Sequence, residues 1–247
     1  MRKYNIYTLA KTAYERDGFN YVARAGIKYG LEKTVSNLLY LSYYNLHANR
    51  TFEFQSKHYH YFSHPDGRTW RTERTVEIPI IWDIVRLSRE RHERILEVGN
   101  VLSHRFATYH DVLDKYERIP GIINEDVISY KPENPYDLIV SISTMEHVGW
   151  DESPKEPSKI LKGLENLINM LSDKGKIIMT VPLGYNSFLD NLLKREPSIF
   201  NERFFLKRVS NTEWKEVNWE QMESIEYNYK TFCANGILLG IINKTSS

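Results

Sequence analysis

The sequence predicts an α/β fold, in which a mostly parallel sheet is covered on both faces and follows an extension of helices and a hairpin. Two observations predict it. From Arg94 onward, short apolar segments that suit buried strands alternate with loops and with one clear helix. Before Arg94, helical spacing comes first and is followed by the alternation typical of a hairpin. We therefore divide the chain into an N-terminal extension, residues 1–93, and an α/β domain, residues 94–247.

The extension combines helical and hairpin patterns. The predicted elements are helices over residues 5–17 and 19–47, a β-hairpin over 51–74 and a helix over 76–88. The hairpin is expected to turn at residues 64–67, His-Pro-Asp-Gly, which is a strong turn signal. Pro79 is expected in the first turn of the last helix, where proline is tolerated.

The α/β domain alternates strands with loops. The predicted strands are residues 94–98, 110–114, 121–127, 137–142 and 176–182, and residues 159–171 predict a helix. The helix after the first strand must be short, because few residues separate that strand from the second. The tail segments 204–210, 212–219 and 232–243 are expected to complete one sheet edge as antiparallel strands.

The composition indicates a globular protein without the basic footprint of nucleic-acid binding. The chain has 247 residues and a net charge of +1. Its single cysteine, Cys233, excludes an internal disulfide and a cysteine-built metal site, and it fits a reducing compartment. No segment reaches the ~20 apolar residues that span a bilayer, and the start lacks the apolar core of a signal peptide. We expect a cytoplasmic protein.

The positive charge is concentrated at the front of the chain. Residues 1–50 hold eight Lys and Arg and three Asp and Glu, and they are rich in tyrosine. Two interpretations are open. The segment is a helical cap packed on the main domain, or it makes a peripheral contact with an anionic membrane at the inner surface.

Acidic residues follow the predicted strands at the edge where open parallel sheets bind ligands. The segments after the first four strands are Glu97-Val98-Gly99-Asn100, Asp114-Lys115, Asp126-Val127 and Ser143-Thr144-Met145-Glu146-His147. Asp114 is placed to accept hydrogen bonds from both hydroxyls of a ribose. Asp126 can accept one from the exocyclic amine of adenine. Acids at successive strand ends favour a nucleoside site over unrelated solvated loops.

These motifs resemble the class I S-adenosylmethionine-dependent methyltransferases over residues 94–186, most specifically in DLIVSISTMEHV and LSDKGKIIMTVP. The resemblance implies a Rossmann-like, seven-stranded, mostly parallel sheet with a reversed last hairpin and the cofactor S-adenosylmethionine at its carboxyl edge. It implies that Gly99 lets the backbone pass the methionine moiety, Asp114 holds the ribose and Asp126 lies by the adenine. Glu97 would order the turn. The residues expected to bind the cofactor are Glu97, Gly99, Asn100, Asp114, Lys115, Asp126, Val127 and Ser143.

The chain departs from the family in its first turn. Glycines that are usual there are replaced by Val101 and Ser103. S-adenosylmethionine has no pyrophosphate, so the close backbone approach of a phosphate cradle is less strict. Asn100 tolerates a positive φ and is expected to make the turn. A nicotinamide dinucleotide would need the missing glycines and ranks far below.

The acceptor side is expected beyond the fourth strand. His147 is the expected general base, because histidine titrates near neutrality; the other interpretation is that it packs the loop. The residues expected to contact the substrate are Tyr61, Arg74, Glu146 and Tyr185. His58 and His60 would share one strand face, but no third ligand is evident, so we expect no metal.

Aromatic side chains interleaved with hydrogen-bonding groups suit a sugar ring or a planar phenol. The expected function is therefore O-methylation of a sugar, a glycan or another small hydroxyl acceptor, as in polysaccharide biosynthesis. Two alternatives are open. One is small-molecule N-methylation, and the other is a catalytically silent methyltransferase-like module that binds a partner.

Overall fold

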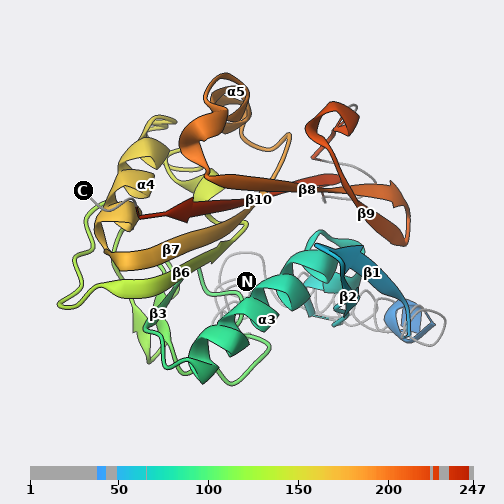
Figure 1. Ribbon diagram of the computed structural model, residues 1–247, viewed down its shortest axis with the longest axis horizontal. Coiled ribbons are helices and arrows are strands. Elements are labelled where there is room, and N and C mark those ends of the chain that lie inside the picture. The colour runs from blue at the N-terminus through green and yellow to red at the C-terminus, as the bar shows by residue number, and fades with distance from the viewer. Residues whose placement is uncertain (1–37, 43–48, 65, 223–224, 228–233, 245–247) are drawn as a thin grey trace, which may run out of the picture.

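The computed structural model describes residues 38–42, 49–64, 66–222, 225–227 and 234–244 (Figure 1). The predicted helix 5–17, most of the predicted helix 19–47, most of the expected membrane contact and Cys233 lie outside these residues. Residues 38–42 are helical, as predicted, and Leu38, Leu39 and Leu41 are exposed. In the described part of the chain, no helix is long and apolar enough to cross a bilayer.

The hairpin is shorter than predicted and turns elsewhere. β1 (Thr51–Phe54) pairs antiparallel with β2 (Lys57–His60). The turn residues Gln55 and Ser56 have positive φ values of 50° and 59°, as a two-residue type I′ turn requires. The prediction of a turn at residues 64–67 is therefore wrong, and that stretch leads into a short 3₁₀ helix, η1 (Asp66–Arg71).

Helix α3 (Arg74–Glu90) confirms the helix predicted over 76–88, but it begins two residues earlier. Pro79 consequently lies in the second turn of the helix, not in the first. A proline has no N–H to bond the carbonyl four residues before it. That carbonyl, on Thr75, instead accepts a hydrogen bond of 2.8 Å from the backbone N–H of Phe62. Because Pro79 leaves this carbonyl without a partner inside the helix, the carbonyl can bind the segment that follows the hairpin.

The main sheet has eight strands in the order β5-β4-β3-β6-β7-β10-β8-β9 (Figure 1). The strands are β3 (Ile95–Val98), β4 (Asp111–Leu113), β5 (Ile122–Ile123), β6 (Tyr136–Ile142), β7 (Leu171–Pro182), β8 (Glu202–Ser210), β9 (Glu213–Val217) and β10 (Gly236–Asn243). The first five of these are parallel, and β10 enters antiparallel between β7 and β8. The expected mostly parallel sheet with a reversed last hairpin is confirmed. The eighth strand, β9, extends the edge as an antiparallel neighbour of β8.

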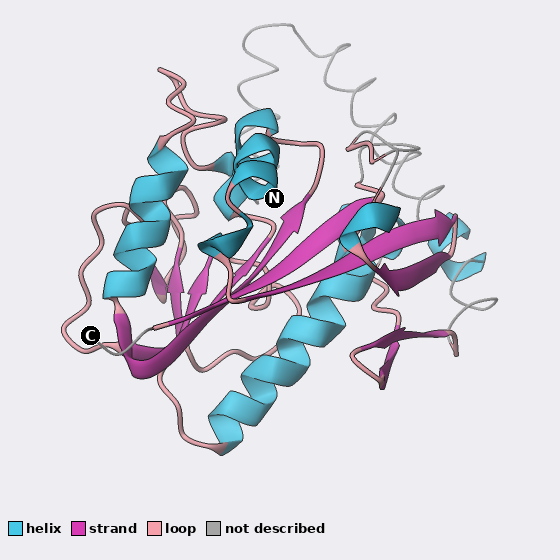
Figure 2. Ribbon diagram, turned by 45° about the horizontal axis from the view of Figure 1, so that its top comes forward, coloured by secondary structure: helices cyan, strands magenta, loops and turns pink. Residues whose placement is uncertain are grey.

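Apolar residues at alternate strand positions build one core on each face of the sheet. In β7, Ile177 and Met179 pack in the cluster that contains α4 (Lys159–Asn169) and α5 (Ser187–Arg195). Ile178, between them, packs in the cluster that contains α3 and the hairpin residues Phe52 and Phe54, as the two-residue period of a strand requires. Figure 2 shows helices on both sides of the twisted sheet. The hairpin and α3 therefore share a core with the sheet.

Three connections differ from expectation. No helix forms in residues 99–110, which are all described; the expected short helix is absent. β5 is only two residues long, because the chain turns at Asp126, whose carbonyl accepts hydrogen bonds from the N–H groups of Ser129 and Tyr130. Helix α5 was not predicted. It begins at a capping residue, Asn186, whose side chain accepts from the Leu189 N–H.

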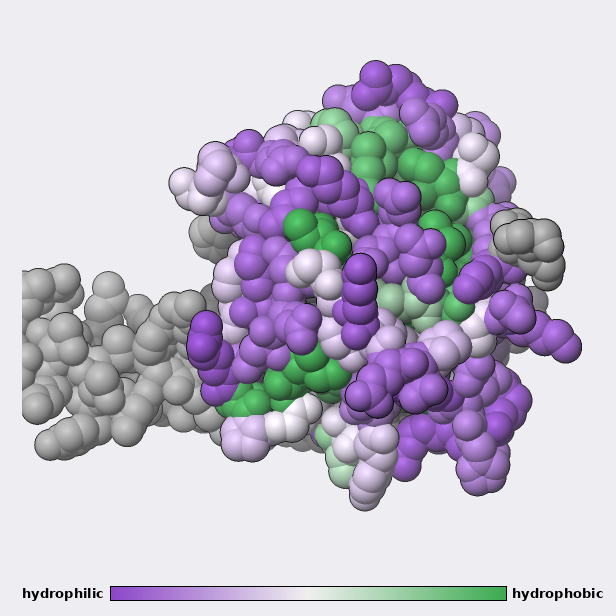
Figure 3. Space-filling model, turned by 90° about the vertical axis from the view of Figure 1, so that its left-hand side faces the viewer, coloured by the Kyte–Doolittle hydropathy of each residue, from purple (hydrophilic) through white to green (hydrophobic). Residues whose placement is uncertain are grey.

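Two surface hollows lie away from the carboxyl edge of the sheet. One, of about 490 Å³, lies between the hairpin and β9. The other, of about 300 Å³, is lined mainly by apolar side chains of α4, β10 and the 3₁₀ helix η3 (Pro197–Ile199). Figure 3 shows the face on the α4 side of the molecule, where apolar patches lie among polar residues. Neither hollow contains a residue predicted to belong to the functional site.

Candidate functional site at the carboxyl edge of the sheet

The buried carboxylate of Glu97 organises the turn after β3. Its Oε1 accepts hydrogen bonds from the backbone N–H groups of Val101 and Leu102, at 2.7 and 2.8 Å. Its Oε2 lies 3.0 Å from Nε2 of His110. A buried carboxylate is stable only with such partners. Glu97 thus orders the turn by binding two of its backbone amides.

Gly99 brings this turn against the segment that follows β6. Its φ is +83°, and a Cβ added there would lie 2.2 Å from Oγ1 of Thr144. Only glycine combines this conformation with so close an approach. The expectation that Asn100 takes the positive φ is wrong, because Gly99 makes the turn and Asn100 is not among the described residues with positive φ.

Asp114 caps the turn after β4. Its Oδ1 accepts hydrogen bonds from the N–H groups of Tyr116 and Glu117, both at 2.8 Å. Its Oδ2 faces the N–H of Asn100 at 3.4 Å, and the Asn100 side chain donates to Glu117 at 3.0 Å. Asp114 is partly exposed. The loops after β3 and β4 are therefore joined, and the more weakly bonded Oδ2 is the atom available to a ligand.

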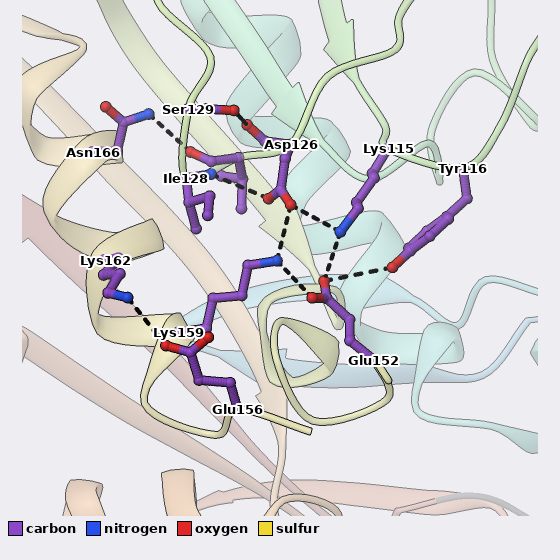
Figure 4. A network of polar contacts seen from close by, with 11 residues as sticks. Lys115, Tyr116, Asp126, Ile128, Ser129, Glu152, Glu156, Lys159, Lys162 and Asn166 are labelled. Atoms are coloured by element: carbon purple, nitrogen blue, oxygen red, sulfur yellow. Dashed lines mark hydrogen bonds and ion pairs between the residues drawn. The ribbon is translucent and has the colours of Figure 1, made fainter. Parts of the chain in front are cut away.

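Four charged side chains form an ion-pair cluster beside these loops: Lys115, Asp126, Glu152 and Lys159 (Figure 4). Oδ2 of Asp126 accepts from both ammonium groups, at 2.8 Å from Lys115 and 2.9 Å from Lys159. Glu152 pairs with the same two lysines, at 3.0 and 2.5 Å. Two positive and two negative charges balance, so the ion-pair cluster is complete without a ligand.

The pKa values in the ion-pair cluster move toward the charged forms. Burial would raise the pKa of the Asp126 carboxyl, but hydrogen bonds from Lys115 and Lys159 outweigh it and lower the pKa. For the Lys115 ammonium, burial alone would lower the pKa. Its hydrogen bonds to Asp126 and Glu152 outweigh burial and raise the pKa. All four groups are therefore ionised near neutrality, as mutual pairing favours.

Asp126, expected to lie by the adenine, belongs to the ion-pair cluster, and Val127 follows it in the chain. Asp126 uses Oδ2 for two lysines, and its Oδ1 accepts at 3.3 Å from the N–H of Ile128. Val127 is buried in the core, and its carbonyl accepts from Asn166 at 2.8 Å. Its side chain therefore faces the protein, and a contact from Val127 to a ligand would have to use the backbone N–H.

A second set of charged groups, the carboxylate cluster, lies at the end of β6: Glu73, Glu77, Glu146 and the guanidinium of Arg74. Arg74, at the start of α3, donates to the carbonyl of Ile142 at 2.7 Å and to Glu77 at 3.2 Å. Ser143, which has a positive φ of 40°, donates to Glu77 at 2.5 Å. The extension therefore contributes charged residues directly to the strand end.

All three glutamates of the carboxylate cluster are buried, with exposed fractions of 7%, 1% and 1% for Glu73, Glu77 and Glu146. Burial, and then repulsion from Glu77, raises the pKa of Glu73. Complete burial raises the pKa of Glu146 well above its usual value. Oε2 of Glu146 has no hydrogen-bond partner among the described residues. The three acids outnumber the one guanidinium.

His147 lies in the 3₁₀ helix η2 (Met145–His147) and is held by two further residues. Its Nδ1 lies 2.5 Å from Oδ2 of Asp151, and the same oxygen accepts from the Tyr185 hydroxyl. Its Nε2 lies 3.5 Å from Oε1 of Glu146. The ring also meets Tyr185 edge-on at 4.8 Å, and Tyr185 packs against Tyr227 at 4.5 Å. The structure thus brings His147, Glu146 and Tyr185 together.

Tyr61 does not join this group. Its hydroxyl accepts a hydrogen bond of 2.9 Å from the backbone N–H of Trp214 in β9, and its ring lies 5.0 Å from that of Phe52. Because the hairpin turns early, Tyr61 lies past its end and fixes the extension to the sheet. The expectation that Tyr61 contacts the substrate has no support in these contacts.

Four residues of the site were not identified from the sequence: Asp151, Glu152, Lys159 and Tyr227. Asp151 had a signal, because it follows His147 by four residues, a spacing at which two side chains can meet. For Lys159 and Glu152 the sequence holds no such signal. Among the described residues, no group of three or more His, Cys, Asp or Glu could hold a metal ion.

Comparisons with known proteins found solved structures only: no protein-family model and no curated protein matches the chain. The N-methyltransferase NodS from Bradyrhizobium japonicum, solved with S-adenosylhomocysteine, is 13% identical with a TM-score of 0.44 and covers 72% of this chain and 91% of its own. CalS10, an amino pentose methyltransferase from Micromonospora echinaspora solved with S-adenosylmethionine, is 12% identical (TM-score 0.36; 72% and 93%). The 1,6-didemethyltoxoflavin N1-methyltransferase of Burkholderia thailandensis is 12% identical (TM-score 0.36; 72% and 84%).

The chain has the fold of the class I methyltransferases. This follows from its own strand order, in which five parallel strands are followed by a reversed strand, β10, inserted before the last parallel strand, β8. The ligands of the first two similar structures are S-adenosylhomocysteine and S-adenosylmethionine, the product and substrate forms of the cofactor that the resemblance implied.

Proposed function

We propose that the protein transfers a methyl group from S-adenosylmethionine to a hydroxyl group of a small acceptor, such as a sugar or a glycan. The observation that carries this proposal is the pair of His147 and Asp151, joined at 2.5 Å beside the glycine turn at the carboxyl edge. In open α/β sheets this edge is where ligands bind. The pair supplies a base at the place where the methyl group would be delivered.

The residues of the first two strand ends fit the cofactor. Gly99 has no side chain of its own and packs against Thr144, and Oδ2 of Asp114 has only a 3.4 Å contact. Asp114 would hold the ribose hydroxyls, while Lys115 and Asp126 would border the adenine. When bound, the cofactor supplies a methyl group activated on a sulfonium. No glycine beyond Gly99 is needed in this turn, because Glu97 fixes it from inside.

His147 would act through Nε2. In the neutral tautomer whose Nδ1–H donates to Asp151, the lone pair is on Nε2, and this contact fixes the ring orientation. Glu146 is 3.5 Å from Nε2, too far for a strong hydrogen bond, so this nitrogen is free to take the proton of an acceptor hydroxyl. A base positioned in this way contributes about 10²–10⁴-fold to a rate.

A second candidate is N-methylation of a small molecule. The excess of buried carboxylates next to His147 favours it, because an amine carries the opposite charge. The position of the methyl group in the product, read by NMR, separates the two candidates.

The test measures cofactor binding and methyl transfer on the same variants. We expect S-adenosylhomocysteine to bind in calorimetry, and Asp114→Ala to weaken binding by about 1–3 kcal/mol through lost ribose hydrogen bonds. Asp151→Asn and His147→Ala should lower turnover and leave that binding nearly unchanged. His60→Ala, at an exposed position in the hairpin strand β2, is the matched control. Binding without transfer to any acceptor class supports the silent module, and no binding at millimolar ligand refutes the cofactor assignment.

A further inference from the structure

The carboxylate cluster is unbalanced in a way that protein interiors rarely tolerate. Glu146 is 1% exposed, and its Oε2 has no hydrogen-bond partner among the described residues. The only guanidinium of the cluster, Arg74, is already shared between Glu77 and the carbonyls of Ile142 and Ser143. Buried carboxylates are normally paired with a cation or fully hydrogen-bonded. The orphaned oxygen therefore marks a place that favours a positive charge.

Aromatic rings stand over the same place. Tyr185 packs at 4.5 Å from Tyr227 and at 4.8 Å from His147. Burial, and then the charges of Glu73 and Glu146, raise the pKa of Tyr227 to about 12. The phenol is therefore neutral, and its ring packs on that of Tyr185. Tyrosine faces next to acids are the chemistry that recognises organic cations.

The residues around His147 and Glu146 form a site with one side open to solvent and one side closed. The side chains of His147 and Asp151 are 44% and 46% exposed, whereas that of Glu146 is 1% exposed. A ligand entering past His147 would meet the rings of Tyr185 and Tyr227 first and the Glu146 carboxylate last. A metal ion does not fit this arrangement, because the described residues offer no set of three ligands, and aromatic walls give no coordination.

We propose that the acceptor carries an organic ammonium group, which rests against the packed rings of Tyr185 and Tyr227 and faces the unpaired oxygen of Glu146. The acceptor is then an amino sugar or another compound that carries an ammonium group in addition to the group that is methylated, not a neutral sugar or a phenol. As a statement about the acceptor, this rests on the proposed function. The ammonium pairs with a carboxylate that lacks a partner, while the acceptor hydroxyl or amine lies beside Nε2 of His147.

The experiment titrates the full chain with tetramethylammonium chloride and follows the side-chain NMR signals of the tyrosines. Sodium chloride at the same concentration controls for ionic strength, and tert-butanol serves as an uncharged probe of similar shape. We expect saturable shifts with tetramethylammonium alone. Glu146→Gln removes the charge at nearly constant shape and should weaken binding about tenfold or more. Tyr185→Leu keeps the bulk, removes the aromatic face and should weaken binding by a smaller factor. Glu165→Gln, at an exposed position on α4, should change nothing.

Three results would overturn the proposal: no saturable binding to the wild-type chain, equal binding of tert-butanol, or unchanged affinity in both Glu146→Gln and Tyr185→Leu. A failure here is distinct from a failure of the proposed function, because S-adenosylhomocysteine, which carries no sulfonium charge, is titrated into the same samples. If S-adenosylhomocysteine binds and tetramethylammonium does not, the methyltransferase proposal stands and the ammonium site does not. The reverse result removes the methyltransferase proposal and keeps the cation site.

Discussion

The ion-pair cluster and the carboxylate cluster occupy the same edge of one sheet, yet they solve the problem of charge in opposite ways. In the ion-pair cluster, Lys115 and Lys159 match two carboxylates, and each side chain keeps some exposure. In the carboxylate cluster, three nearly buried acids surround one arginine. The first is neutral and self-sufficient. The second has more acids than cations, and burial raises the pKa of Glu73 and of Glu146.

The difference indicates which end of the edge is prepared for a charged partner. A balanced cluster gains little from a further ion, because each of its charges already has a partner of opposite sign. An unbalanced buried cluster is destabilising alone and becomes favourable when a cation arrives. The neutral adenosine of the cofactor and a positively charged acceptor would fit these two ends in that order.

The largest expected effect concerns Gly99, whose turn joins the two ends. We expect Gly99→Ala to lower the free energy of unfolding by about 3 kcal/mol, because the residue combines φ +83° with a Cβ 2.2 Å from Thr144. Gly121→Ala is the matched control, because its φ is +88° but no atom lies within 4 Å of the added Cβ; it should lower stability by about 1 kcal/mol. Urea unfolding measures both. Equal losses would show that the Thr144 contact is unimportant.

The carboxylate cluster should give stability an unusual pH dependence. The pKa of Glu146 is raised in the folded state above its usual value of 4.5. Its contribution is therefore complete below that value and is lost as the pH rises through the raised pKa. We expect Glu146→Gln to become more stable relative to the wild-type chain as the pH rises from 5 to 8, measured by urea unfolding. Glu165→Gln is the control, and a difference that is flat across this range would contradict the imbalance.

The ion-pair cluster should respond more weakly and with the opposite sign. Asp126→Asn leaves two lysines with one acid, and we expect a loss of about 1 kcal/mol, because the pairs are partly exposed to solvent. Since the pKa of Asp126 is lowered in the folded state, this contribution is present above the usual pKa of aspartate and is lost as the pH falls toward acid values. Added salt should reduce the difference. Asp173→Asn, at an exposed position, is the control. An equal loss of stability there would show that the ion pairs of Asp126 do not cause the effect.

Strands and helices with strong periodic patterns were predicted correctly, as α3, α4 and β6 show. The hairpin was not, because the apparent turn signal at residues 64–67 competes with a tight turn at Gln55–Ser56 that carries no glycine. For the turn after β3, the sequence correctly predicts that Glu97 orders it and that a glycine, Gly99, belongs to it. It does not predict that no helix follows. A carboxylate that accepts two amides of the same loop leaves no trace in hydrophobic periodicity.

The sequence by itself determined the order of the strands along the chain, the acids at their ends and the position of His147, because these depend on local pattern and on one rule about parallel sheets. Only the tertiary structure decided which charges meet. Lys159 reaches Asp126 from 33 residues away, and Glu77 reaches Ser143 from 66. Such pairings depend on how helices dock on the two faces of the sheet, and one sequence records the docked residues but not their distances.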